Sequence, residues 1–166
     1  MELAPVKTIT YRHPKMEDGK NIWKLIQEID VLDLNSAYYY LIFCEYFKDT
    51  CLVAENEGEI VGFVSGFRHP EHREILFVWQ VAVAKSQRGE GLASKLLQKL
   101  LECDECADIR AIQTTISPSN KASYGLFQKL AKQLGADMKK TMRIPPEVFP
   151  GKDHEAEQTY KISPIH

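Results

Sequence analysis

The sequence predicts a single α/β domain. Short β-branched runs and longer segments with helical spacing of apolar residues alternate along the 166 residues, with no internal repeat and no low-complexity linker between them. A chain of this length can bury a substantial hydrophobic core. We therefore expect residues 1–166 to form one domain.

The first half of the chain contains three expected strands and two expected helices. Residues 8–12 alternate like an edge strand, and a helix follows from about Glu17. A second helix begins near Ser36, whose hydroxyl suits an N-cap. Residues 50–55 and 60–67 are predicted strands, and Glu57-Gly58 between them favours a tight turn.

The second half continues the alternation. Residues 75–83 predict a buried strand, and leucines on one face predict a helix beginning at Leu92. A strand over 109–116 and a helix over 121–134 follow, and Gly135 ends that helix as a C′ residue does. Residues 138–144 and 159–162 are expected to be the closing strands.

Composition excludes several classes of function. A formal net charge of -2, with both signs mixed along the chain, gives no electrostatic case for binding nucleic acid. No apolar run is long enough to cross a bilayer, and Met1 does not open a basic-then-apolar signal segment. We therefore expect a cytoplasmic protein with no membrane partner.

The four cysteines fit this expectation. Cys44 and Cys51 lie in apolar segments and are predicted to be small core residues. Cys103 and Cys106 form a single Cys-x-x-Cys without a second pair or closely spaced histidines, whereas a structural zinc site needs four ligands. No metal is expected.

The segment after the 75–83 strand predicts an anion site. A strand, a glycine turn and a helix N-terminus together present unpaired N–H groups to a phosphate or pyrophosphate. A P-loop is excluded because Leu92-Ala93 follows Gly91 where Lys-Ser/Thr is required. A dinucleotide fingerprint is disfavoured because Ser94 replaces its third glycine. Glycines that serve only tight packing remain the alternative.

The six residues 88–93 match the signature Arg/Gln-x-x-Gly-x-Gly/Ala, and with it the chain resembles the GCN5-related N-acetyltransferases. The resemblance implies a central mixed, mostly antiparallel twisted sheet flanked by helices. It also implies that the turn holds the pyrophosphate of acetyl-CoA, that the amides of Val81 and Val83 pair with the pantetheine, and that Val81 stabilises the oxyanion. The implied cofactor contacts are Val81, Ala82, Val83, Arg88, Gly89, Glu90, Gly91, Leu92, Ala93, Asn120 and Phe127.

The chain departs from the family at one position. Many members have a tyrosine seven residues after the asparagine that matches Asn120, where it protonates the leaving thiolate, and here that residue is Phe127. Tyr124 lies on nearly the same helix face. Tyr124, Tyr38 and water remain the alternatives for this acid.

Blocks outside the cofactor turn resemble a branch of the family that acetylates the γ-amine of L-2,4-diaminobutyrate in ectoine biosynthesis, a response to osmotic stress. The blocks are residues 32–36, 50–55, 61–66, 77–83 and 114–120. The resemblance implies direct attack of the amine on acetyl-CoA in a ternary complex. None of the cysteines has an activating base in its motif, so no acyl-enzyme is expected.

The substrate carries two ammonium groups and one carboxylate, so we expect acidic, aromatic and hydroxyl groups around it. Asp33 is the first candidate to orient the amine and accept its proton, directly or through water, with Tyr38 beside it. Trp79 is expected on the same strand face as Val81 by period-two alternation. The other candidates are Glu74, Thr115, His154 and Glu157.

Two other functions stay open. The enzyme could acetylate another small amine, such as a polyamine or an aminoglycoside, or the chain could be a non-catalytic acyl-CoA-binding module. By resemblance we expect a homodimer, and an edge strand near the C-terminus can pair across a two-fold axis.

Overall fold

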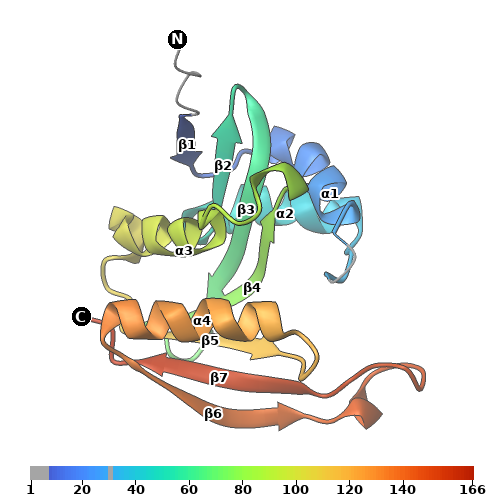
Figure 1. Cartoon of the computed structure of the whole chain (residues 1–166), viewed down its shortest axis with the longest axis vertical. Helices are drawn as coiled ribbons and strands as arrows, with labels where there is room; N and C mark the ends of the chain where they lie inside the picture. Colours follow the sequence, from blue (N-terminus) through green and yellow to red (C-terminus); the bar gives the residue numbers. More distant parts are fainter. Residues whose placement is uncertain (1–7, 30–31) are drawn as a thin grey trace.

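A computed structural model describes residues 8–29 and 32–166 (Figure 1). Its strands form one seven-stranded sheet in the order β1-β2-β3-β4-β5-β7-β6. The strands are β1 (Ile9–Arg12), β2 (Leu52–Asn56), β3 (Glu59–Arg68), β4 (Ile75–Val83), β5 (Ala111–Ile116), β6 (Asp137–Ile144) and β7 (Glu157–Ser163). The helices are α1 (Gly19–Gln27), α2 (Ala37–Tyr46), α3 (Leu92–Glu102) and α4 (Lys121–Leu134). The expected order of strands and helices is confirmed, and every strand pairing except β4 with β5 is antiparallel.

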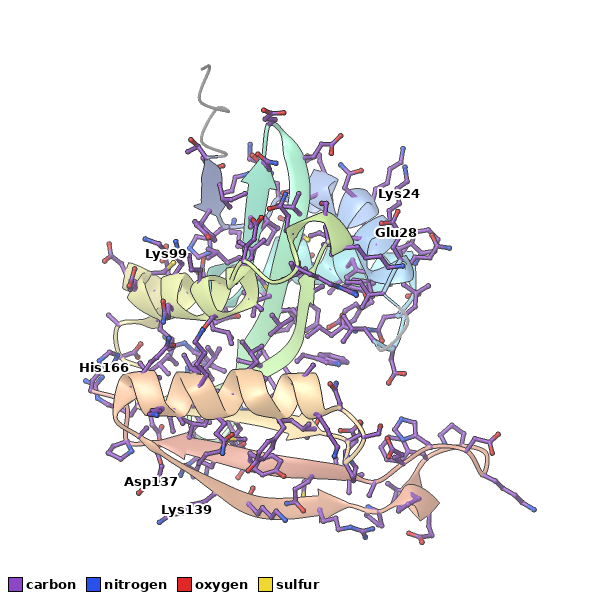
Figure 2. All side chains as sticks on the ribbon, in the orientation of Figure 1. Lys24, Glu28, Lys99, Asp137, Lys139 and His166 are labelled. Atoms are coloured by element: carbon purple, nitrogen blue, oxygen red, sulfur yellow. The ribbon has the colours of Figure 1, made fainter. Side chains whose placement is uncertain are left out.

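The helices cover both faces of the sheet, so the core has two parts, one on each face. Residues of α3 and α4 pack with one face of the sheet, and residues of α1 and α2 pack with the other (Figure 1). On α1 the apolar residues face inward, whereas Lys24 and Glu28 extend outward from the exposed side (Figure 2). No helix in the described part of the chain is long and apolar enough to cross a membrane.

Local signals account for most element ends. The Ser36 hydroxyl accepts a hydrogen bond from the Tyr39 N–H at 3.3 Å and caps α2. Glu57 and Gly58 both have positive φ, as the tight turn between β2 and β3 requires. Gly135 has φ +64 and ends α4. The helix expected from about Glu17 instead begins with a 3₁₀ turn, Met16–Asp18, before α1.

An ion-pair cluster holds that first turn to the sheet. Arg12 in β1 donates to both carboxylate oxygens of Asp18, at 2.7 and 2.8 Å, and also contacts Glu55 in β2. The Lys15 N–H donates to Asp18 at 2.6 Å. Burial acts to raise the pKa of Asp18, but the Arg12 and Lys15 hydrogen bonds outweigh it and the pKa is lowered.

The sheet opens between β4 and β5, and this opening positions the site. The two strands pair only over a short parallel stretch, in which Ile75–Phe77 of β4 pair with Ala111–Gln113 of β5. Beyond that point β5 pairs with β7 alone, and the two halves of the sheet diverge (Figure 1). The Thr114 hydroxyl donates to the Val78 carbonyl at 3.0 Å where the strands part.

The expectation that Trp79 and Val81 share a face is wrong. The register between β3 and β4 shifts between Ser65 and Gly66, which pair with Gln80 and Val78, so Trp79 is an extra residue in a β-bulge. Val81 packs with the core beneath α3 and α4, whereas Trp79 contacts rings of α2 on the other face. A bulge interrupts period-two alternation, which is why the prediction failed.

Candidate active site

A cavity of about 550 Å³ lies at the opening of the sheet. Its walls come from the end of β4, the turn that follows, the N-terminus of α4 and the segment after α1. The lining residues are Ile29, Leu32, Val81, Ala82, Val83, Lys85, Arg88, Ala93, Asn120, Ala122, Ser123 and Leu126. The sequence predicted the residues from β4, Arg88, Ala93 and Asn120, but not Lys85, the two apolar residues after α1, or Ala122, Ser123 and Leu126 of α4.

Backbone alternation gives the cavity a row of free amides. The Ala84 N–H donates to the Val61 carbonyl of β3 at 2.8 Å. Because successive residues of a strand point their N–H groups to opposite edges, the amides of Val81 and Val83 face away from β3. They face the edge where β5 has diverged, so an extended ligand can pair with them.

The glycine turn forms a second cavity of about 250 Å³ that shares Val83, Arg88, Ala93 and Leu126 with the first. Gly89 and Gly91 have φ of +80 and +74, and a Cβ on either would meet no protein atom within 4 Å. Glycine is therefore required by the backbone conformation, and the space above the turn is open. No side chain caps α3, so its first N–H groups are available to an anion.

Of the remaining predicted cofactor residues, Glu90, Leu92 and Asn120 lie at the turn or at a cavity wall, whereas Phe127 does not. Glu90 is exposed in the turn, and Leu92 is buried in the core while also lining the smaller cavity. The Asn120 side chain accepts from the Ser123 N–H at 3.1 Å and caps α4 at the cavity wall. Phe127 was expected at the cofactor but is buried in the core and lines neither cavity; its neighbour Leu126 lines both.

Four of the predicted substrate residues come together from separate parts of the chain, and we call them the acceptor group: Asp33, Thr115, His154 and Glu157. His154 Nε2 lies 3.9 Å from Asp33 Oδ2, although these residues are far apart in sequence. The His154 ring is held by stacking on Phe149, with ring centroids 3.7 Å apart. Asp33 itself is exposed, so it is accessible to a ligand.

Glu157 is the half-buried carboxylate of the acceptor group. Burial raises its pKa above the ordinary value of 4.5, and the negative charges of Asp33 and Glu155 act in the same direction. His154 and the Thr115 hydroxyl oppose the shift without cancelling it. A carboxylate with a raised pKa is a better proton acceptor than an ordinary surface acid.

Gln80 connects the acceptor group to the central strand, and it was not among the predicted site residues. Its side-chain N–H donates to the Asp33 carbonyl at 2.7 Å, and its side-chain oxygen accepts from the Tyr40 hydroxyl at 3.1 Å. Gln80 is buried on the same face as Trp79 because of the bulge. A polar residue in the middle of an otherwise apolar strand was the signal available in the sequence.

The aromatic candidates and Glu74 occupy different surroundings. Trp79 is 45% exposed and lies edge-on to Tyr39, with ring centroids 4.7 Å apart, and Tyr38 is 70% exposed at the start of α2. Glu74 is not brought to the acceptor group. It is exposed just before β4, at the closed end where its carbonyl accepts from the Arg110 and Ala111 N–H groups.

The cysteines are poor nucleophiles. Cys44 and Cys51 are fully buried, as expected, and burial raises the pKa of each thiol to about 12. Burial likewise raises the pKa of Cys106 to about 11. A thiol that stays protonated at neutral pH does not form an acyl-enzyme readily.

Comparison with known proteins gives consistent results. Residues 20–131 match the model of the Acetyltransferase (GNAT) family. The L-2,4-diaminobutyric acid acetyltransferase of Halalkalibacterium halodurans is 48% identical over 98% of this chain and 88% of its own length. That of Shouchella clausii is 45% identical over 99% of this chain and 91% of its own length.

A solved structure extends the similarity to the fold. The diaminobutyrate acetyltransferase EctA from Paenibacillus lautus, in complex with its substrate L-2,4-diaminobutyric acid and coenzyme A, superposes with a TM-score of 0.93. It is 44% identical, and the match covers 97% of this chain and 98% of that one.

Proposed function

The chain belongs to the GNAT family of acetyltransferases, and from this we propose that it transfers acetyl from acetyl-CoA to the γ-amine of L-2,4-diaminobutyrate. The product is N4-acetyl-L-2,4-diaminobutyrate, an intermediate of ectoine biosynthesis. The observation that carries the substrate assignment is identity of 48% extending over nearly the whole chain, well beyond the cofactor turn.

Acetyl-CoA extends across the two cavities, with its pyrophosphate at the glycine turn and its pantetheine along β4. The pyrophosphate accepts hydrogen bonds from the N–H groups of the Gly89–Gly91 turn and of the first turn of α3. The pantetheine lies along the free edge of β4, where the amides of Val81 and Val83 and the Asn120 side chain line the wall. The thioester carbonyl then accepts from the Val81 N–H, which stabilises the oxyanion of the tetrahedral intermediate.

The acceptor group supplies the other half of the reaction. Asp33 binds an ammonium of the substrate, and Glu157 takes the proton that makes the γ-amine nucleophilic, directly or through water. Trp79 and Tyr38 form an aromatic side of the pocket in this proposal. The neutral amine attacks the thioester carbon and the C–N bond forms; the nitrogen then gives its extra proton to water as the C–S bond breaks.

No side chain is assigned to protonate the leaving thiolate. Phe127 has no acidic hydrogen and lies in the core, and the Tyr124 ring packs edge-on to Tyr160. A thiol of ordinary pKa, about 8.5, leaves readily as a thiolate and takes its proton from water. The buried cysteines favour direct attack over an acyl-enzyme.

The test is release of free CoA by purified protein with acetyl-CoA and L-2,4-diaminobutyrate, with mass spectrometry to locate the acetyl group. We expect acetylation of the γ-amine, with ornithine and putrescine much slower. Turnover confined to other amines would overturn the substrate. CoA binding without turnover on any amine would favour the non-catalytic module. Phe127, in place of the tyrosine that many family members have, is the feature of the sequence that favours this module.

We further propose a cytoplasmic homodimer. All four cysteines are free, as suits a reducing compartment. Strand β6 ends the sheet, and most of its residues are exposed, including Met142 at 64%. Lys139 projects from this strand (Figure 2). An exposed edge of this kind can pair across a two-fold axis, and light scattering during gel filtration gives the mass that tests it.

A further inference from the structure

A cluster of three metal-ligating side chains lies outside the acetyl-transfer site. A ring nitrogen of His13, the Sγ of Cys103 and a carboxylate oxygen of Glu105 all lie within 4.8 Å of one another. His13 follows β1, whereas Cys103 and Glu105 follow α3, so only the fold brings them together. Cys106, the other member of the Cys-x-x-Cys pair, is fully buried and points its thiol to the Asp49 carbonyl instead.

The histidine is oriented as a metal ligand. His13 Nδ1 lies 2.9 Å from the Cys51 carbonyl oxygen, and because a carbonyl only accepts, Nδ1 carries the hydrogen. Nε2 faces Glu105 Oε2 at 3.3 Å, and because a carboxylate also only accepts, Nε2 donates to it in the metal-free protein; loss of this proton gives Nε2 the lone pair that binds a metal. A backbone carbonyl on the far nitrogen is the usual outer contact of a metal-binding histidine.

The spacing suits a tetrahedral ion. Zinc bonds of about 2.0–2.3 Å place neighbouring ligand atoms about 3.3–3.7 Å apart, and the His13–Glu105 pair already has this separation. Cys103 is half-buried, and its thiol donates to the Lys99 carbonyl at 3.3 Å.

We propose, against the expectation from the Cys-x-x-Cys pair alone, that His13, Cys103 and Glu105 bind one zinc ion, with water as the fourth ligand. A thiolate, an imidazole and a carboxylate select zinc and its analogue cobalt over magnesium and calcium, which prefer oxygen ligands alone. On binding, the Cys103 thiol and His13 Nε2 each release a proton to solvent, and the sulfur–metal and nitrogen–metal bonds form. The zinc joins the segment after β1 to the segment between α3 and β5, and so stabilises the fold.

This site takes no part in acetyl transfer. It lies beyond the C-terminus of α3, whereas the cofactor turn precedes the N-terminus, and 11 helical residues span about 16 Å. Failure of zinc binding and failure of acetyl transfer, the proposed function, can therefore be distinguished. CoA release by the metal-free protein measures acetyl transfer alone.

The test is titration of metal-free protein with Co²⁺, followed by displacement with Zn²⁺. We expect one cobalt per chain, a sulfur-to-cobalt charge-transfer absorption and tetrahedral visible bands, and a rise in Tm with Zn²⁺. Cys103→Ser removes the charge-transfer absorption, and Cys103→Ser and Glu105→Gln each weaken binding about tenfold or more. Glu102→Gln, a matched loss of charge at the end of α3, leaves binding unchanged.

Two results would overturn the site: no stoichiometric cobalt binding by the wild-type protein, or equal binding and absorption in Cys103→Ser. The thermal unfolding of each metal-free variant shows that it is folded before titration. Since Cys103 is a half-buried residue at a helix end, its replacement by serine is expected to leave the metal-free Tm close to that of the wild type.

Discussion

At the scale of single residues, Glu157 gives the sharpest test of the acceptor group. We expect Glu157→Gln to lower kcat with L-2,4-diaminobutyrate about 10²–10⁴-fold, because glutamine cannot accept the amine proton. Since the pKa of Glu157 is raised, its ionised fraction falls as pH drops through that raised value. The wild-type kcat/KM should therefore decline on the acid side, and the variant should lose this dependence.

Glu155→Gln is the matched control. Glu155 is exposed, accepts a hydrogen bond from Ser119 and has no assigned role in transfer. Its variant should keep the wild-type kcat and still decline on the acid side, with the decline moved to lower pH because the Glu155 charge that helps to raise the pKa of Glu157 is gone. An unchanged kcat in Glu157→Gln would remove Glu157 from proton transfer and return that role to Asp33 or water.

Gly91 provides a residue-scale test of the cofactor turn. Its φ of +74 costs an L-residue about 1–2 kcal/mol, and a Cβ would project into open space where the pyrophosphate is proposed to bind. We expect Gly91→Ala to raise the KM for acetyl-CoA about tenfold or more. Steady-state kinetics with varied acetyl-CoA measure this.

Gly125 in α4 is the control for that substitution. It has no positive φ, and an added Cβ would meet nothing within 4 Å. Gly125→Ala should raise the free energy of unfolding by about 0.5–1 kcal/mol and leave the KM alone. If both alanines change the KM equally, the backbone conformation of Gly91 is not what the cofactor requires.

At the scale of elements, Asp18 joins the 3₁₀ turn before α1 to β1. Asp18→Asn cannot hold both guanidinium hydrogen bonds, so we expect a loss of about 1–3 kcal/mol in the free energy of unfolding near neutral pH. Because the pKa of Asp18 is lowered, the carboxylate stabilises the fold above its ordinary value of 3.8. That contribution is lost as pH falls through the lowered pKa of the folded state.

Urea unfolding at neutral pH and at pH values below 3.8 tests the prediction. The difference in the free energy of unfolding between the wild type and Asp18→Asn should become smaller at the lower pH. Glu17→Gln removes a neighbouring exposed acid of the same turn and should cost little at either pH. A gap that does not change with pH would mean that the charge of Asp18 is not the stabilising feature.

The element scale also shows how local signals succeed and fail. The Ser36 cap, the Glu57-Gly58 turn and Gly135 each act within a few residues, and each was predictable. The bulge at Trp79 was not, because it arises from the register between β3 and β4.

At the scale of the whole molecule, the divergence of β4 from β5 makes the proposed cofactor site. We expect CoA to slow amide hydrogen exchange at Val81 and Val83, whose N–H groups face the opening. Ala82 and Ala84 are the internal control, since their N–H groups face β3 and are already paired. Residue-resolved NMR exchange measures all four, and equal slowing at every position would contradict pairing along this edge.

The acceptor group also forms only through the fold of the whole molecule. Asp33 follows α1, Thr115 lies in β5, and His154 and Glu157 come from the end of the chain. Each was a candidate by resemblance, but the raised pKa of Glu157 follows first from burial and then from the negative charges of Asp33 and Glu155. Gln80, which holds the Asp33 backbone, was missed because its partner lies 47 residues away.

The sequence by itself determined the α/β class, the element order and the glycine turn, because apolar periodicity, caps and turn residues act over short distances. The tertiary structure alone decided the opening between β4 and β5, the face of Trp79, the core position of Phe127 and the meeting of His13 with Cys103. These depend on strand register and on contacts between distant segments. Such contacts form only when the whole chain packs, so no local pattern encodes them.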